Sequence, residues 1–163
     1  TNNKKLRDKL LMIRNHGMLK GYDTRLLGLN LRLPEINAAI ATVQMKKLPK
    51  FLKTREKNAK LLSKLLSKSN LDLPVERKNE NVNWYLYTIS TSKRNTLLKK
   101  LNAKGIGAAS YYPIPVHKTP FYKSKTKLPI TDWAASSVLS LPIHPKVTTK
   151  NIEFIAKTVS EVL

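Results

Sequence analysis

The chain has 163 residues, of which 41% are hydrophobic and none is cysteine. This length suits one domain or one compact part of a larger protein, and the apolar share is enough to build a packed core. The absence of cysteine excludes disulfides, thiolate metal sites and cysteine catalysis. Thirty-one Lys and Arg against ten Asp and Glu give a net charge of +21, which attracts nucleic acid, acidic membranes or phosphorylated small molecules.

The charge alone does not identify a partner. The basic residues are mostly lysines spread along the chain, which is typical of a solvated surface. Three His and ten acidic residues supply few ligands for a metal. No apolar run approaches the roughly 18–20 residues that span a bilayer, and the N-terminus has neither an initiator Met nor a signal-like core. We therefore expect a soluble, cytoplasmic chain that begins in mid-protein, with no metal or membrane partner, and the charge alone does not favour nucleic acid as a partner.

The first half is predicted to be mainly helical. Apolar side chains recur at helical spacing over residues 4–15. Residues 16–33 have little apolar periodicity and predict an extended loop. A second helix is expected to begin at Pro34, which suits the first position of a helix. Pro49 should kink or break this helix, and a further helix should run to about residue 68.

The second half alternates strands and helices. After a connection over 69–83, the pattern predicts a strand over 84–90, a helix over 94–104 and a returning strand over 106–112. A proline-rich loop is expected over 113–131, followed by a short helix after Asp132. A strand over 138–141 and a last helix capped by Thr148 or Thr149 complete the chain. This order predicts an α/β fold with one small sheet covered by helices. We expect a helical arm at 1–70, with an interface loop at 16–36, and a small α/β domain at 71–163.

An amide and a guanidinium stand two residues apart just before the predicted long helix. Asn30 and Arg32 can bind an anion there, helped by the backbone N–H groups of the helix N-terminus. The alternative is a surface loop in which Asn30 is satisfied locally and Arg32 is solvated. The residues alone favour this alternative.

A proline-rich segment holds two tyrosines and a histidine. Tyr111, Tyr112 and His117 beside stiff prolines are the components of a ligand wall, because fixed backbone angles preorganise the side chains. The alternative, which the residues alone favour, is a surface loop with a packing histidine. His16 and His144 are isolated and are interpreted as structural.

The motifs of several other classes are absent. The chain has no Gly-rich dinucleotide loop, no Walker loop and no nucleophile elbow. The proline break at residue 49 is not typical of a DNA-reading helix-turn-helix. The two tryptophans and the tyrosines at 84–87 can stack on nucleic-acid bases, but strand packing explains them more simply. Four acidic residues have no evident carboxylate partner: Asp8, Asp23, Asp72 and Asp132.

Four motifs occur in a fixed order along the chain. The first combines Arg14–Gly17 with Gly28–Leu33, and the other three are Pro34–Ile40, Tyr111–His117 and Val138–Pro145. Together they resemble the C-terminal part of the DegT/DnrJ/EryC1/StrS sugar aminotransferases, which use pyridoxal phosphate. Asn37 stands where Gln is usual in that family. The resemblance covers nearly the whole chain and implies the small C-terminal domain of a fold-type I aminotransferase, preceded by a long helical arm. It also implies a homodimer that acts on nucleotide-linked keto-sugars with an amino-acid donor such as glutamate.

The resemblance also implies what this chain lacks. In such enzymes the lysine that binds pyridoxal phosphate lies shortly upstream of a segment ending in Thr-Asn-Asp, which survives here only as Thr1–Asn3. No catalytic residue is therefore expected within 1–163, and no covalently bound cofactor. The piece on its own is expected to be inactive.

The family's binding residues carry over by position. Asn30 would reach the cofactor phosphate of the neighbouring subunit, with Arg32 beside it, and Tyr111, Tyr112 and His117 would line the sugar-nucleotide pocket. Two alternatives stay open. The first is a basic regulatory or nucleic-acid-binding protein, since some family members have been labelled regulators. The second is a non-catalytic subunit that pairs with a lysine-bearing N-terminal half.

Overall fold

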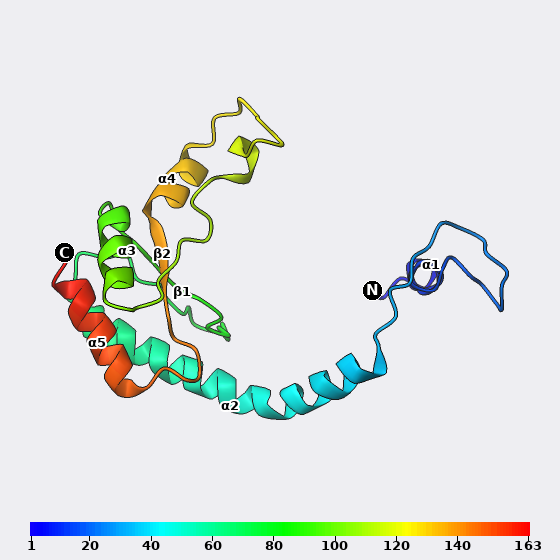
Figure 1. Cartoon of the computed structure of the whole chain (residues 1–163), viewed down its shortest axis with the longest axis horizontal. Coiled ribbons are helices and arrows are strands. Elements are labelled where there is room, and N and C mark those ends of the chain that lie inside the picture. Colours follow the sequence, from blue (N-terminus) through cyan, green and yellow to red (C-terminus); the bar gives the residue numbers. More distant parts are fainter. The chain divides into compact units, whose positions relative to one another are not determined.

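The computed structural model describes all 163 residues (Figure 1). The chain forms two compact units, residues 1–47 and 48–163. A domain boundary at residue 70 stays a prediction. The elements are α1 (Lys4–Arg14), α2 (Glu35–Leu66), β1 (Tyr87–Ser90), α3 (Arg94–Ala103), the 3-10 turn η1 (Val116–Lys118), α4 (Pro129–Ser137), β2 (Val138–Leu141) and α5 (Thr149–Ser160).

In the first unit, the predicted loop is fastened to the end of α1. The N–H groups of Leu29 and Leu31 donate to carbonyls in the last turn of that helix, at 2.8 and 2.9 Å. The loop lies so close that a Cβ on Gly28 would stand 1.9 Å from the backbone nitrogen of Gly17. Gly17 itself has a φ of +72°, which favours glycine. These two glycines therefore fix the path of the loop.

The first unit leaves most of its apolar side chains in contact with solvent. Only Gly17 is buried within residues 1–47. The exposed large apolar residues of α1, the loop and the start of α2 are Leu6, Leu10, Leu11, Leu19, Leu27, Leu29, Leu31, Leu33, Ile36, Ile40, Val43 and Met45. A stripe of this kind is typical of a surface that another polypeptide covers.

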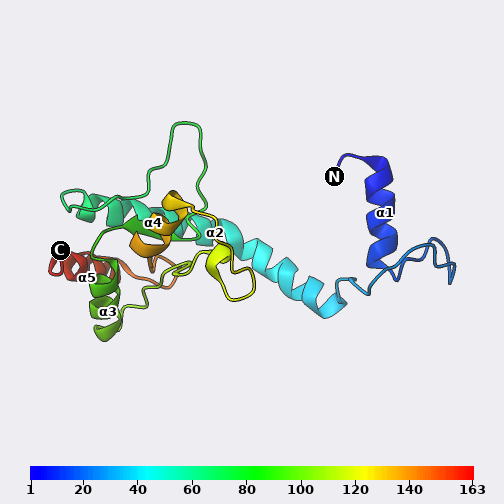
Figure 2. The ribbon, with the colours of Figure 1, turned by 90° about the horizontal axis from the view of Figure 1, so that it is seen from above.

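The second unit is built on a two-stranded antiparallel sheet. Tyr87 pairs with Leu141, and Ile89 pairs with Leu139, so these four side chains share the buried face. Two strands alone are marginal in water, and helices complete the core. The core includes Leu62 and Leu66 of α2, Leu97 and Leu101 of α3, and Ile152, Ile155 and Val159 of α5. Figure 2 shows α3 and α5 beside each other, and the two helices are in contact. The predicted small sheet covered by helices is confirmed.

One core tyrosine has a polar partner. The Tyr87 hydroxyl lies 2.8 Å from the Ser63 hydroxyl. Burial raises the pKa of the Tyr87 phenol above its ordinary value of 10.0, and the hydrogen bond to Ser63 opposes this rise. The phenol therefore stays neutral in the folded core.

Three predicted details are wrong. The predicted break at Pro49 does not occur, because α2 continues to Leu66 and its later turns are held in the core, whereas the alternative of a kink at Pro49 stays a prediction. The first strand begins at Tyr87 and not at residue 84, because Trp84 has a φ of +49°. No strand forms over 106–112. Only Ala109 bridges to Ser140, and the prolines that follow prevent a longer ladder.

Other details are confirmed. Thr148 caps α5 in a capping box, in which its side chain accepts from the Asn151 N–H and the Asn151 side chain accepts from the Thr148 N–H. Gly105 follows α3 with a φ of +75°. None of the helices combines the length and apolar character needed to cross a bilayer.

Candidate functional site

A cluster of polar side chains forms in the loop of the first unit. The Arg32 Nε donates to the Asn30 Oδ1 at 3.1 Å, and the Arg32 Nη2 lies 3.4 Å from the Nε2 of His16. The Asn30 amide nitrogen and the Arg32 Nη1 make no hydrogen bond within the chain, and both residues are exposed. His16, which the sequence suggested was structural, therefore helps to orient Arg32.

This cluster has the chemistry of an anion site. Guanidinium and amide N–H groups are donors only, and they match the acceptor oxygens of a phosphate or carboxylate. The Asn30–Arg32 hydrogen bond holds the two free donors next to each other. The residues therefore fit a phosphate group. The hydrogen bond that the Asn30 side-chain oxygen accepts from Arg32 also agrees with the alternative, a surface loop in which Asn30 is satisfied locally.

The lysines offer no protected nucleophile. All 24 are exposed. The one resolved pKa shift among them belongs to Lys60, where a hydrogen bond and the charge of Glu56 raise the pKa above 10.5. A lysine that attacks a carbonyl needs the opposite shift, which burial or a neighbouring cation produces.

Tyr111 and Tyr112 lie together in the second unit. Their ring centroids are 6.0 Å apart with the rings edge to face, and both side chains are exposed. Tyr111 lines a cavity of about 230 Å³ beyond the Tyr87 end of the sheet, together with Arg55, Tyr85 and His144. His144, interpreted above as structural, thus faces the same space as Tyr111.

Arg55 organises this end of the sheet and was missed by the sequence analysis. Its Nη1 donates to the carbonyl oxygens of Trp84 and Tyr85, at 3.1 and 2.9 Å, and its guanidinium lies 5.9 Å from the Tyr85 ring centroid. Arg55, Tyr85 and His144 also line a second cavity of about 510 Å³. No local pattern marks Arg55, because its partners lie about thirty residues further along the chain.

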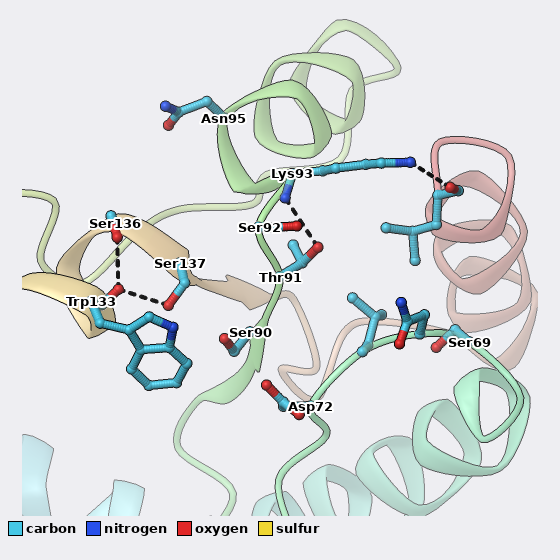
Figure 3. Close-up of a pocket in the computed structure, with 13 residues that line it drawn as sticks. Ser69, Asp72, Ser90, Thr91, Ser92, Lys93, Asn95, Trp133, Ser136 and Ser137 are labelled. Carbon is cyan, nitrogen blue, oxygen red and sulfur yellow. Dashed lines mark hydrogen bonds between the residues drawn. The ribbon is translucent and has the colours of Figure 1, made fainter. Parts of the chain in front are cut away.

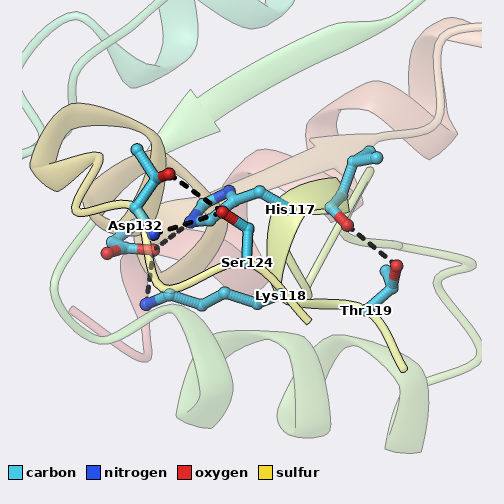
Figure 4. Close-up of polar contacts among 7 residues, drawn as sticks. His117, Lys118, Thr119, Ser124 and Asp132 are labelled. Atoms are coloured by element: carbon cyan, nitrogen blue, oxygen red, sulfur yellow. Dashed lines mark hydrogen bonds and ion pairs between the residues drawn. The ribbon is translucent and has the colours of Figure 1, made fainter. Parts of the chain in front are cut away.

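His117 points elsewhere. In Figure 4 its ring faces Asp132, with its Nε2 3.9 Å from the Oδ1 of Asp132, and Lys118 Nζ lies 2.7 Å from the same oxygen. The Ser124 N–H donates to the His117 carbonyl at 2.8 Å. Asp132 has no carboxylate partner here, as expected, and its partners are the basic groups of His117 and Lys118. The structure does not place His117 in the cavities that Tyr111 and Tyr85 line.

Residues 1–160 match the model of the DegT/DnrJ/EryC1/StrS aminotransferase family. The chain belongs to this family. It is 34% identical, over 89% of its length, to the dTDP-3-amino-3,4,6-trideoxy-alpha-D-glucose transaminase of Streptomyces venezuelae, and 33% identical, over 99%, to a pleiotropic regulatory protein of Geobacillus stearothermophilus. These matches cover 40% and 45% of the two relatives, so the chain spans less than half of their length.

The fold agrees with that of solved family members. The crystal structure of S. venezuelae DesV superposes with a TM-score of 0.92 at 31% identity, over 99% of this chain and 45% of that one. The aminotransferase fold that the sequence predicted is therefore confirmed. Within this fold, the Asn30–Arg32 cluster belongs to the first unit and the Tyr111 cavity to the second.

Proposed function

We propose that the chain is the C-terminal portion of a pyridoxal-phosphate-dependent aminotransferase that acts on nucleotide-linked keto-sugars, with an amino acid as donor. Family membership and the transaminase relatives support this class of reaction. The observation that carries the proposal is the exposed Asn30–Arg32 pair, held by the close approach of two glycines in an otherwise open loop. Such a rigid pair of donors is suited to a phosphate.

The cofactor and this chain have separate tasks. Pyridoxal phosphate supplies the electron sink for transfer of an amino group. In the proposal, Asn30 and Arg32 bind its phosphate in the neighbouring subunit of a homodimer. The exposed apolar stripe of the first unit supports a role in covering a partner polypeptide.

Substrate binding is assigned to the second unit. Tyr111 and Tyr112 would form one wall of the sugar-nucleotide pocket, and the cavity that Tyr111 lines supports this role. His117 would contribute through the loop that it holds, since its ring faces Asp132. The cytoplasmic location expected from the sequence stays a prediction.

The chain alone is proposed to be inactive. All its lysines are exposed, whereas a lysine that binds pyridoxal phosphate needs a desolvated or cation-flanked pocket. The reactive lysine would then belong to an N-terminal half, on the same polypeptide or on a separate chain.

Replacing Asn30 tests the phosphate contact. In the holoenzyme that contains these residues, Asn30→Ala should weaken binding of pyridoxal phosphate by about tenfold or more, because a hydrogen bond to a charged group contributes about 1.5–3 kcal/mol. Absorbance titration of the apoenzyme measures this. Asn102→Ala, an exposed asparagine on α3, is the control and should leave the affinity unchanged. Equal affinity for Asn30→Ala and the control would remove Asn30 from the site.

A regulatory or nucleic-acid-binding role is the second candidate. The charge of +21 and the relative described as a pleiotropic regulatory protein favour it. Binding driven by phosphates should weaken by several decades between low and moderate salt. Absence of DNA binding at low salt eliminates this candidate.

A further inference from the structure

A polar pocket lies at the other end of the sheet from the Tyr111 cavity. It has a volume of about 680 Å³, within the usual range for small-molecule sites of about 300–1,000 Å³. It is lined by the loop after α2, the end of β1, the start of α3 and the end of α4. The Tyr111 cavity is lined by Leu86 and Leu141, whereas this pocket is lined by Ser90 and Ser137. The two are therefore separate sites.

The lining combines one aromatic ring with polar groups that lack partners. Trp133 is 53% exposed, and its indole N–H donates to nothing within the chain. Ser90 is 8% exposed, lines the pocket, and its hydroxyl makes no hydrogen bond. In Figure 3 the Ser90 side chain lies between the Trp133 indole and the Asp72 carboxylate. The Ser90 hydroxyl reaches solvent in the pocket and is therefore available to a ligand.

The backbone holds these groups in place. Asp72 and Ser90 exchange two backbone hydrogen bonds, at 3.2 and 3.0 Å. The Thr91 N–H donates to the Ser137 carbonyl at 3.1 Å, and the Arg94 guanidinium donates to two carbonyls of α4 at 2.9 Å each. The pocket is therefore preorganised, which reduces the entropy cost of binding.

Charge alone does not select the ligand of this pocket, because the lining holds both the Lys93 ammonium and the Asp72 carboxylate. The Arg94 guanidinium is occupied by its two carbonyls, and the Lys93 Nζ donates to the Leu163 carbonyl at 2.6 Å. The Asp72 carboxylate forms no ion pair, so its oxygens are free to accept hydrogen bonds from a ligand. A carboxylate, an amide and hydroxyls instead exchange hydrogen bonds with ligand hydroxyls. An exposed indole offers an apolar face to the C–H groups of a sugar ring.

We propose that this pocket binds a neutral saccharide, with Trp133 as the stacking platform and Ser90 and Asp72 as hydrogen-bond partners. Nothing in the proposed transamination requires this site, so it does not rest on that proposal. Asn70 and Asn95, which also line the pocket, supply further amide groups to ring hydroxyls.

The test uses the ¹⁵N-labelled chain and three neutral probes: methyl glucoside, methyl galactoside and N-acetylglucosamine. At least one probe should shift the indole N–H resonance of Trp133 saturably in the millimolar range, and that of the buried Trp84 should not move. The Trp133→Phe variant assigns the two resonances. In parallel, inorganic phosphate should produce no saturable shift of Trp133.

Variants test the contacts by backbone amide shifts of Ser90–Lys93. Trp133→Ala should weaken binding at least tenfold. Ser90→Ala should weaken it about threefold to tenfold, as expected for one neutral hydrogen bond, and Asp72→Asn should also weaken it. Tyr22→Ala, an exposed aromatic in the first unit, should bind as the unmodified chain does. The proposal is overturned if none of the sugars gives a saturable shift, if phosphate binds in their place, or if Trp133→Ala keeps full affinity.

Discussion

Leu139→Ala is expected to lower the free energy of unfolding of the second unit by about 2–5 kcal/mol. Leu139 is fully buried on β2 and pairs with Ile89 in the register of the sheet. Removing its side chain leaves a cavity under a sheet of only two strands, which has few other contacts to compensate. Urea unfolding followed by circular dichroism measures the loss.

The matched control is Leu27→Ala. Leu27 is 92% exposed in the loop of the first unit, so its removal should change the free energy of unfolding by less than about 0.5 kcal/mol. Equal effects of the two substitutions would contradict the placement of the core between the sheet and the helices.

Gly28→Ala is expected to open the loop that carries the Asn30–Arg32 pair. The new Cβ would stand 1.9 Å from the Gly17 nitrogen and 2.5 Å from the His16 carbonyl carbon, and backbone atoms cannot move aside cheaply. We expect a local loss of about 2–4 kcal/mol, seen as at least thirtyfold faster amide hydrogen exchange at Leu29 and Leu31. Both N–H groups donate to α1 in the unmodified chain.

Gly107→Ala is the control for this substitution. A Cβ at Gly107 would meet nothing within 4 Å, and its φ is not in the left-handed region. Exchange at Leu29 and Leu31 should stay as in the unmodified chain. Unchanged exchange in Gly28→Ala as well would show that the loop does not depend on this close approach.

Local patterns predicted the regular elements well. Apolar periodicity placed α1, α3 and α5 to within about two residues, and Thr148 was recognised as a candidate cap because a side-chain acceptor suits that position. The β-branched and apolar residues of 138–141 correctly predicted β2. Such signals depend only on neighbouring residues.

Long-range contacts account for what the sequence did not predict. Arg55 binds the carbonyls of Trp84 and Tyr85 and so occupies groups that a strand would have used. The pairing of His16 with Arg32 needs the loop to fold back onto α1. The pairing of His117 with Asp132 likewise joins residues fifteen apart. None of these partners is marked by spacing or residue type.

The polar pocket beside Trp133 illustrates the same limit. In the sequence, Asp72 was set aside because no second carboxylate accompanied it, and the tryptophans were set aside because strand packing explained them more simply. The backbone bridge between Asp72 and Ser90 and the anchoring of α4 bring them to one cavity. The character of the pocket emerges only from the tertiary structure.

We propose that this chain binds a cofactor phosphate while the reactive lysine belongs to another segment. The direct measurement is to incubate the chain with equimolar pyridoxal phosphate, reduce with borohydride and map the modified lysines by mass spectrometry. The account predicts low labelling spread over many of the 24 exposed lysines. Stoichiometric labelling of a single lysine would contradict it, because the nucleophile would then lie within residues 1–163.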